Sequence, residues 1–319
     1  MNTDVTFQVY AHPEADLREL EAHPARGSVL DLIARLADPD LLGVEPGYPN
    51  RRVTGTCRIC CQLRLLTFEH LPPRAAGNSV RARGAPAARM LQDETIEFPS
   101  NGWTDAQRGV GAHVLCGPCN SHCGLHLVPE YAVLANVVTD ALPQLAVYDP
   151  EKGLGLPGTV DLSLPGFALG NVARQAIAML LGASGGAAVA RLYPELPRLV
   201  AGEMLEKPPG VRLGLALCPD GGRIRLAPPH AVLQPGSASM FVEVAAPPFR
   251  WTLSWPGEHL VLPDGVTDVT DWLALSLDET TDIQVALKVG MVVGAAPGDT
   301  RDLAAIEAEL PKCPAGDDA

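Results

Sequence analysis

Two Cys-x-x-Cys pairs constrain the fold of this chain more than any other feature of its sequence. The first pair is Cys57-Arg-Ile-Cys60 and the second is Cys116-Gly-Pro-Cys119. Two tight turns of this kind present four thiolates to one Zn²⁺ ion in a tetrahedron. The spacing therefore predicts a structural zinc ion held by Cys57, Cys60, Cys116 and Cys119, which joins two segments that are distant in the sequence.

Redox use and chance clustering are the alternatives to zinc. A redox Cys-x-x-Cys pair needs a βαβ context and gains nothing from a second pair, while chance leaves both pairs unexplained. Cys218 is expected to be an ordinary buried residue, and Cys313 belongs to the tail. Other possible ligands crowd the two pairs: Cys61, Cys123, His113, His122 and His126.

The segment between the two pairs carries residue types that suit hydrolysis. Residues 63 to 68 are predicted to form a strand that ends at Glu69 and His70, and a helix can begin at Cys119. A Glu carboxylate and the amide oxygen of Asn120 suit a hard divalent cation such as Mg²⁺ or Mn²⁺. A neutral imidazole can take a proton from water near neutral pH.

The order of these motifs resembles that of the HNH endonuclease family with a zinc-bound ββα-metal core. The shared order is Cys-x-x-Cys, Glu69-His70-x-x-Pro73, Cys-x-x-Cys-Asn120 and then Gly124. Gln107-Arg-Gly109 and Tyr131 also look like a bacterial subgroup of these proteins. The resemblance covers residues 54 to 131, about a quarter of the chain.

The resemblance implies a role for each of five residues. His70 would be the general base that activates a water molecule, while Glu69 and Asn120 would hold the catalytic Mg²⁺ or Mn²⁺. Arg74 would contact a phosphate. Asn78 would either orient the His70 backbone or approach the metal.

The charge distribution is compatible with a localised phosphate-binding site. The whole chain has a formal net charge of −13, which argues against indiscriminate binding to nucleic acid. Between Arg51 and His113, however, nine arginines stand against five acidic residues. A solvated surface is the alternative interpretation of this basic segment.

The pattern of elements predicts an α+β chain with an N-terminal zinc-stapled ββα-metal (HNH) domain and a β-rich α+β accessory domain. The expected divisions are an accessory segment 1–52, the zinc domain 53–147, the β-rich domain 160–305 and a tail 306–319. The Pro/Gly-rich stretch 148–158 marks the boundary between the domains.

Hydrophobic periodicity places the individual elements. Short helices are predicted at 29–37 and 171–181, the second ended by Gly182. Strands are predicted at 211–217, 223–226, 240–244, 250–255, 272–277 and 283–289. Five aromatic residues are expected in the core rather than on a base-stacking platform: Phe241, Phe249, Trp251, Trp255 and Trp272.

Three functions follow from these features. The first is a cytoplasmic endonuclease that hydrolyses DNA, rather than RNA, in bacterial defence against phage or mobile DNA. The second is a zinc-scaffolded binding or regulatory protein with an inactive HNH site, because Glu69 stands where the family commonly has Asp. The third is a redox protein that uses Cys60 and Cys61.

The sequence also predicts the kinds of partner. The C-terminal domain would contact a protein partner or a second copy of the chain. No membrane association is expected, because the most apolar stretch, 172–181, is short and contains Arg174 and Gln175.

Overall fold

A computed structural model describes most of the chain between residues 53 and 289, together with strand β1 (Val9–Ala11). The described ranges are 9–11, 53–79, 82–84, 104–106, 109–142, 147–149, 153–155, 158–184, 187–218, 225–234, 237–255, 262–263 and 265–289. The helix predicted at 29–37, the tail with Cys313 and most of the segment 80–108 lie outside them.

A three-stranded antiparallel sheet carries the first Cys-x-x-Cys pair between its first two strands. Its order is β2 (Val53–Thr56), β3 (Leu63–His70) and β6 (Gly111–Cys116). Thr67 pairs with Leu115 and Phe68 with His113, so Val114 is an extra residue in β6 and forms a bulge. The carbonyl oxygen of Val114 accepts a hydrogen bond from the backbone N–H of Arg58 over 3.0 Å, which ties the first pair to β6.

A nearly continuous helical run begins within the second Cys-x-x-Cys pair, directly after Cys116. It consists of α4 (Gly117–His122), a π-turn η2 (Cys123–Leu127) and α5 (Val128–Ala141). The N–H of Val128 donates to the carbonyl of Cys123, five residues earlier, as a π-turn requires. The predicted strand before Glu69 and the predicted helix at Cys119 are therefore both present.

The largest sheet has six strands in the order β1-β11-β12-β13-β10-β14. Apart from β1, which pairs in parallel with β11, the neighbours run antiparallel. The other strands are β10 (Arg212–Leu217), β11 (Arg225–Gln234), β12 (Ser237–Ala246), β13 (Phe249–Trp255) and β14 (Thr267–Asp268).

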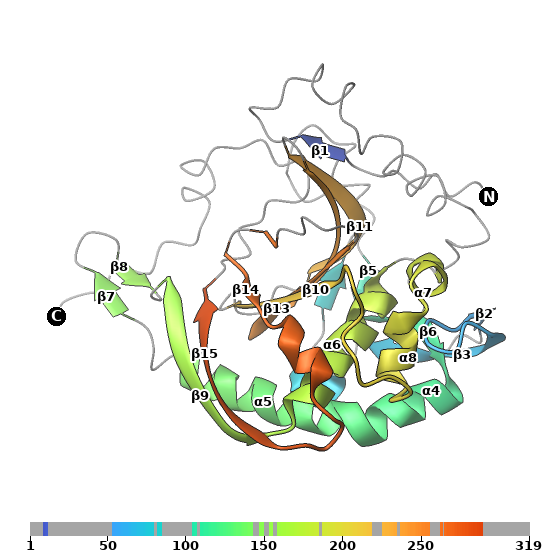
Figure 1. The fold of residues 1–319 in the computed structure, drawn as a ribbon, viewed down its shortest axis with the longest axis horizontal. Coiled ribbons are helices and arrows are strands. Elements are labelled where there is room, and N and C mark those ends of the chain that lie inside the picture. Colours follow the sequence, from blue (N-terminus) through green and yellow to red (C-terminus); the bar gives the residue numbers. More distant parts are fainter. Residues whose placement is uncertain are drawn as a thin grey trace.

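Helix α6 (Leu169–Ala183) occupies the centre of the molecule (Figure 1). Residues 169–182 are all buried, including the polar Asn171, Arg174 and Gln175, as expected for a helix enclosed on every side. It packs against β12 and β13 on one side and against α5, η2 and β6 on another. Its buried Arg174 donates hydrogen bonds to backbone carbonyls, including Leu275 over 2.8 Å and Gly170 over 3.0 Å.

The elements that carry the cysteine pairs and the six-stranded sheet share one hydrophobic core. Tyr131 of α5 contacts Phe249 and Trp251 of β13, with ring centroids 6.1 and 6.4 Å apart. A single cluster of buried apolar side chains runs from Cys57 to Leu287. The two predicted domains are thus joined by packing, and the boundary at 148–158 stays a prediction.

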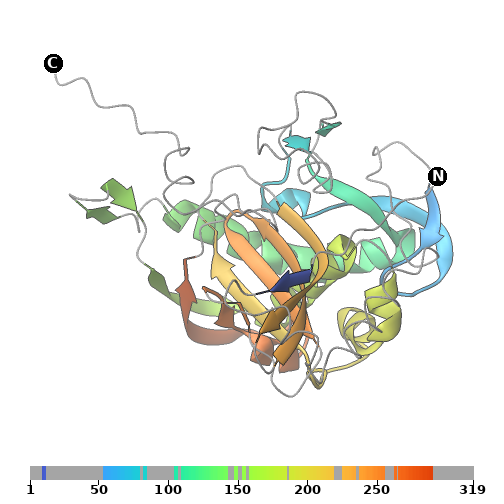
Figure 2. The same ribbon diagram turned by 90° about the horizontal axis from the view of Figure 1, so that it is seen from above.

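Smaller elements surround this core. A two-stranded ribbon lies at the opposite end of the molecule from β2 and β3 (Figure 2). It consists of β9 (Thr159–Phe167) and β15 (Thr281–Lys288). The remaining elements are η1 (Arg74–Ala76), β4 (Ala82–Gly84), β5 (Thr104–Ala106), β7 (Val147–Asp149), β8 (Gly153–Gly155), α7 (Ala188–Leu192), α8 (Glu195–Val200) and η4 (Thr270–Ala274).

Most of the predicted elements of the C-terminal half are present, and one is wrong. Helix 171–181 is α6, and the strands at 211–217, 240–244, 250–255 and 283–289 correspond to β10, β12, β13 and β15. The strand predicted at 223–226 overlaps β11, which begins at Arg225. Of the strand predicted at 272–277, residues 272–274 lie instead in the 3₁₀ helix η4, and residues 275–277 belong to no strand. The Asp268 carboxylate accepts hydrogen bonds from the N–H and hydroxyl of Thr270 and turns the chain where η4 begins.

The predicted burial of the aromatic residues is confirmed. All five side chains are at most 4% exposed: Phe241, Phe249, Trp251, Trp255 and Trp272. Cys218, which is also predicted to be buried, is fully buried. Among the described residues, no helix combines the length and apolar character needed to cross a membrane.

Candidate functional site

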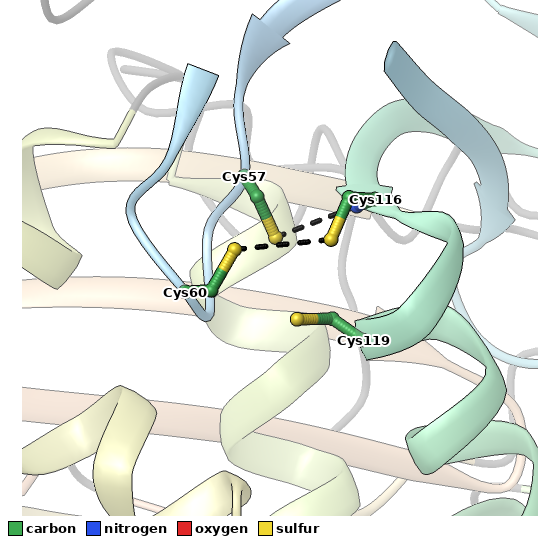
Figure 3. A group of neighbouring side chains, drawn as sticks. All are labelled: Cys57, Cys60, Cys116 and Cys119. Carbon is green, nitrogen blue, oxygen red and sulfur yellow. Dashed lines mark hydrogen bonds between the residues drawn. The ribbon is translucent and has the colours of Figure 1, made fainter. Parts of the chain in front are cut away.

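The four predicted zinc ligands converge on one point (Figure 3). The sulfur atoms of Cys57, Cys60, Cys116 and Cys119 all lie within 4.8 Å of one another, and the Cys60 and Cys116 sulfurs are 3.8 Å apart. Zn–S bonds of about 2.3 Å in a tetrahedron place sulfurs about 3.8 Å apart. The four cysteines therefore form a cluster that could hold a zinc ion.

Two different local structures deliver these thiols. Cys57 and Cys60 lie in the turn between β2 and β3, where the N–H of Cys61 donates to the carbonyl of Cys57 over 3.0 Å. Cys61 adopts a φ of 54°, the left-handed conformation that reverses the chain after a tight turn. Cys116 ends β6, and Cys119 lies in the first turn of α4.

Hydrogen bonds to Cys57 favour its thiolate form. The pKa of the Cys57 thiol lies well below its ordinary value, first because the Cys119 thiol donates to it and also because backbone N–H groups, including that of Cys116 at 3.4 Å, point at its sulfur. The pKa of the Cys119 thiol is raised for the same reason. A thiolate is the form that binds a metal.

The alternative ligands near the pairs do not join this group. Among the described residues, the only set of three or more His, Cys, Asp or Glu side chains close enough to share an ion is the four-cysteine cluster. Cys123 is 1% exposed and interacts instead with Glu69; burial and this like charge raise the pKa of its thiol to about 12. His122 bonds to the carbonyl of Val200 over 3.0 Å.

Glu69 and Asn120 lie on the same side of β3. Thr67 and Glu69 are two residues apart on the strand and so share a face. The amide nitrogen of Asn120 donates to the hydroxyl of Thr67 over 2.9 Å, and Cys123, one turn after Asn120, interacts with Glu69. Glu69 therefore faces α4 and the π-turn, as Asn120 does from the helix.

Burial changes the chemistry of the Glu69 carboxyl. It raises the pKa of Glu69 from 4.5 to about 7, because the charged form loses contact with water. No cation among the described side chains offsets this cost. A divalent ion next to the carboxylate would lower the pKa again.

His70 ends β3 and lies on the other face of the strand. Its ring packs edge-on against that of Phe68, with centroids 5.2 Å apart, and Phe68 in turn contacts the buried His113 at 5.5 Å. Consecutive strand residues point to opposite faces, so His70 and Glu69 flank the end of β3 from its two sides. Arg74 is exposed at the start of η1, four residues after His70.

Asn78 fixes the segment that follows His70. Its side-chain nitrogen donates to the carbonyls of Pro72 and Val110, both at 2.7 Å, and its side-chain oxygen accepts from the N–H of Val110 at 2.8 Å. The side chain is 3% exposed. Of the two roles that the resemblance implies for Asn78, these bonds correspond to orienting the backbone after His70.

Two glycines permit this close packing. A Cβ atom on Gly109, whose φ is 99°, would lie 2.2 Å from the carbonyl oxygen of Asn78. A Cβ atom on Gly111 would lie 2.1 Å from the carbonyl oxygen of Glu69. Real side chains do not approach backbone atoms so closely, so both positions require glycine.

Several residues of this region have no distinctive signal in the sequence. Thr67, which holds the Asn120 amide, is one hydroxyl residue on an amphipathic strand. Gly109 is marked only by its place in Gln107-Arg-Gly109. Arg58, between the first two cysteines, is only one of the nine arginines of the basic segment.

A comparison of the chain with models of known protein families, with characterised proteins and with solved structures finds no match.

Proposed function

We propose that the chain is a divalent-metal-dependent endonuclease of the HNH type, acting on DNA, with a structural zinc ion at the four-cysteine cluster. The observation that carries the proposal is the Thr67–Asn120 hydrogen bond of 2.9 Å. It holds an amide on the Glu69 face of β3, three residues before His70 ends the strand. A carboxylate and an amide thus share one face of β3, and an imidazole lies on the other face at the end of the strand. The first cysteine pair precedes the opposite end of β3.

Each residue has a defined task in this proposal. His70 takes a proton from the attacking water through a ring nitrogen. The Glu69 carboxylate and the Asn120 side-chain oxygen would hold Mg²⁺ or Mn²⁺, which would supply stabilisation of negative charge on the phosphodiester. Asn78 keeps the backbone after His70 in place, and the exposed Arg74 guanidinium binds a neighbouring phosphate.

The decisive experiment is a plasmid-cleavage assay with Mg²⁺ or Mn²⁺ on the wild-type chain, His70→Ala and His126→Ala. His126 is an exposed histidine on the π-turn and serves as the matched control. We expect nicking or cutting by the wild type and His126→Ala, and a loss of at least about a hundredfold in His70→Ala, within the range of a general base. Equal cleavage by all three proteins, or none by any of them across metals and substrates, would refute the proposal.

A second candidate is a zinc-scaffolded protein that binds a partner without cleaving nucleic acid. Two observations favour it. The raised pKa of Glu69, about 7, leaves much of this carboxyl uncharged at neutral pH. In addition, Leu63 and Leu65 lie on one face of β3 and are 74% and 54% exposed. This candidate predicts DNA or protein binding that His70→Ala leaves unchanged, with no cleavage.

A further inference from the structure

Arg58 is a buried cation inside the first Cys-x-x-Cys pair. It is 1% exposed, although it lies between two zinc ligands in a turn. Its backbone N–H donates to Val114, and its Nη1 donates to the carbonyl of Thr56 over 2.9 Å. Its Nε and Nη2 are shielded from solvent and have no hydrogen-bond partner among the residues that the structure describes.

A guanidinium in this position needs a negative charge nearby. Removing an ion from water without a partner costs several kcal/mol, so buried arginines are normally paired with an anion. The groups that favour the charged form of Arg58 are the thiols of Cys57 and Cys61, whereas Arg191 is a second cation and opposes it. Among the described side chains, no carboxylate contributes.

The cysteine cluster supplies the missing negative charge. Four thiolates around one Zn²⁺ ion carry a net charge of −2, and this charge lies in a partly buried site. The second pair has only Gly117 and Pro118 between its cysteines and offers no cationic side chain. Because Nε and Nη2 are closed to solvent, an anion from outside, such as a DNA phosphate, does not reach them.

We propose that Arg58 is the internal counter-cation of the four-cysteine centre, stabilising the four-thiolate form and thereby retaining the zinc ion. The inference rests on the zinc occupancy in the proposed function, but not on nuclease activity. It implies that removing the charge of Arg58 leaves the net charge of −2 at the zinc centre without its buried counter-cation, so that zinc is bound more weakly. Outer partners of metal ligands commonly change metal affinity by about 10–100-fold.

The experiment compares the full-length wild type with Arg58→Met, Arg58→Lys and Arg64→Met. Arg64 is an exposed arginine on β3 whose guanidinium donates to the side chain of Gln62, so it is the matched control. Zinc content is measured by elemental analysis, and zinc affinity by competition with a chromogenic chelator from mildly acidic to mildly alkaline pH. Co²⁺-substituted protein reports the thiolate ligands through their charge-transfer absorption.

We expect Arg58→Met to bind zinc about tenfold or more weakly than the wild type, and to release Co²⁺ to the chelator correspondingly earlier. Arg58→Lys keeps the charge and should recover most of the affinity, and Arg64→Met should match the wild type. Wild-type affinity in Arg58→Met, or equal losses in the Met and Lys variants, would overturn the proposal, since equal losses indicate packing rather than charge.

Two further outcomes are also decisive. If Arg58→Met is insoluble, Arg58→Lys is compared with Arg58→Gln, because Gln retains hydrogen-bonding groups without the charge. Equal zinc affinities of these two variants contradict the proposal. If the wild type contains no zinc, both the zinc centre and the role of Arg58 fail. Zinc-loaded protein that does not cut DNA removes the nuclease proposal alone.

Discussion

The side-chain amide of Asn120 donates a hydrogen bond to the hydroxyl of Thr67 over 2.9 Å, and this hydroxyl donates to the carbonyl of Leu115 over 2.9 Å. The chain of bonds connects α4, which contains Cys119, with strands β3 and β6. It sets the position of the Asn120 amide relative to Glu69, two residues further along β3.

Removing the Thr67 hydroxyl should therefore impair a site that depends on Asn120. In Thr67→Val we expect cleavage to fall by about tenfold to a hundredfold, because small displacements of catalytic groups are costly, while zinc content stays constant. Thr54→Val, at an exposed position of β2, is the control and should retain full activity. Plasmid cleavage and elemental analysis on the same samples test this, and undiminished cleavage in Thr67→Val contradicts it.

Substitution of Gly109 should destabilise the protein. Its φ is 99°, and a Cβ atom at this position would lie 2.2 Å from the carbonyl oxygen of Asn78. We therefore expect Gly109→Ala to lose about 2 kcal/mol or more in the free energy of unfolding. Gly124→Ala is the matched control, because it lies in the helical run with open space around its Cβ position. Urea unfolding should show a lower midpoint for Gly109→Ala and no loss for Gly124→Ala.

Loss of the four-cysteine site should destabilise the whole fold and not only the turn that carries the first cysteine pair. Elemental analysis should find about one zinc ion per chain in the wild type and in His70→Ala, and none in Cys57→Ser combined with Cys119→Ser. Because Cys57 and Cys116 belong to the continuous core, the double variant should also lower the thermal midpoint. Full zinc content in the double variant would contradict the four-thiolate assignment.

The pH dependence of stability should contain a contribution from Glu69. Its pKa is about 7 in the folded chain and about 4.5 otherwise, so the folded state binds more protons between these values. Stability is then lost as the pH rises through this window. The loss is at most about 3.4 kcal/mol, from about 1.36 kcal/mol per pKa unit, and is smaller where water reaches the carboxyl.

Glu69→Gln isolates this contribution. Without added Mg²⁺ or Mn²⁺, the variant should gain stability relative to the wild type as the pH rises from about 4.5 to 7. Urea unfolding at several pH values measures the difference. If the free energies of unfolding of the two proteins differ by the same amount at every pH in this range, the pKa of Glu69 is not raised.

The main residues of the candidate site could be predicted from the sequence because their signals are local. Cys57 with Cys60, and Cys116 with Cys119, have the spacing of two metal-binding turns, and the predicted strand ends at Glu69 and His70. Their convergence follows from pairing of β3 with β6. The partners of Asn120 and Asn78 were not accessible, because Thr67 and Val110 carry no pattern that distinguishes them from other strand residues.

The fold was harder to predict from the sequence where a local hydrogen bond or a bulge interrupts a regular hydrophobic pattern. Trp272 stands in an apolar run that suits a strand, but Asp268 binds Thr270 and starts a 3₁₀ helix instead. Likewise, β11 continues through Pro228 and Pro229, where the register shifts between Ala227 and His230. Hydrophobic periodicity signals neither the hydrogen bond of Asp268 nor the register of β11 against β12.

The contact of Tyr131 with Phe249 and Trp251 determines how the chain can be divided experimentally. A fragment of residues 53–147 would contain both cysteine pairs and Asn120, yet it would expose Tyr131 and lose α6, against which Leu71 and Val114 pack near Gly182. Such a fragment should aggregate or unfold even when supplied with zinc. The cysteine-bearing segment is consequently not an independently folding unit that could be transferred to another protein, because its core is completed by α6 and the six-stranded sheet.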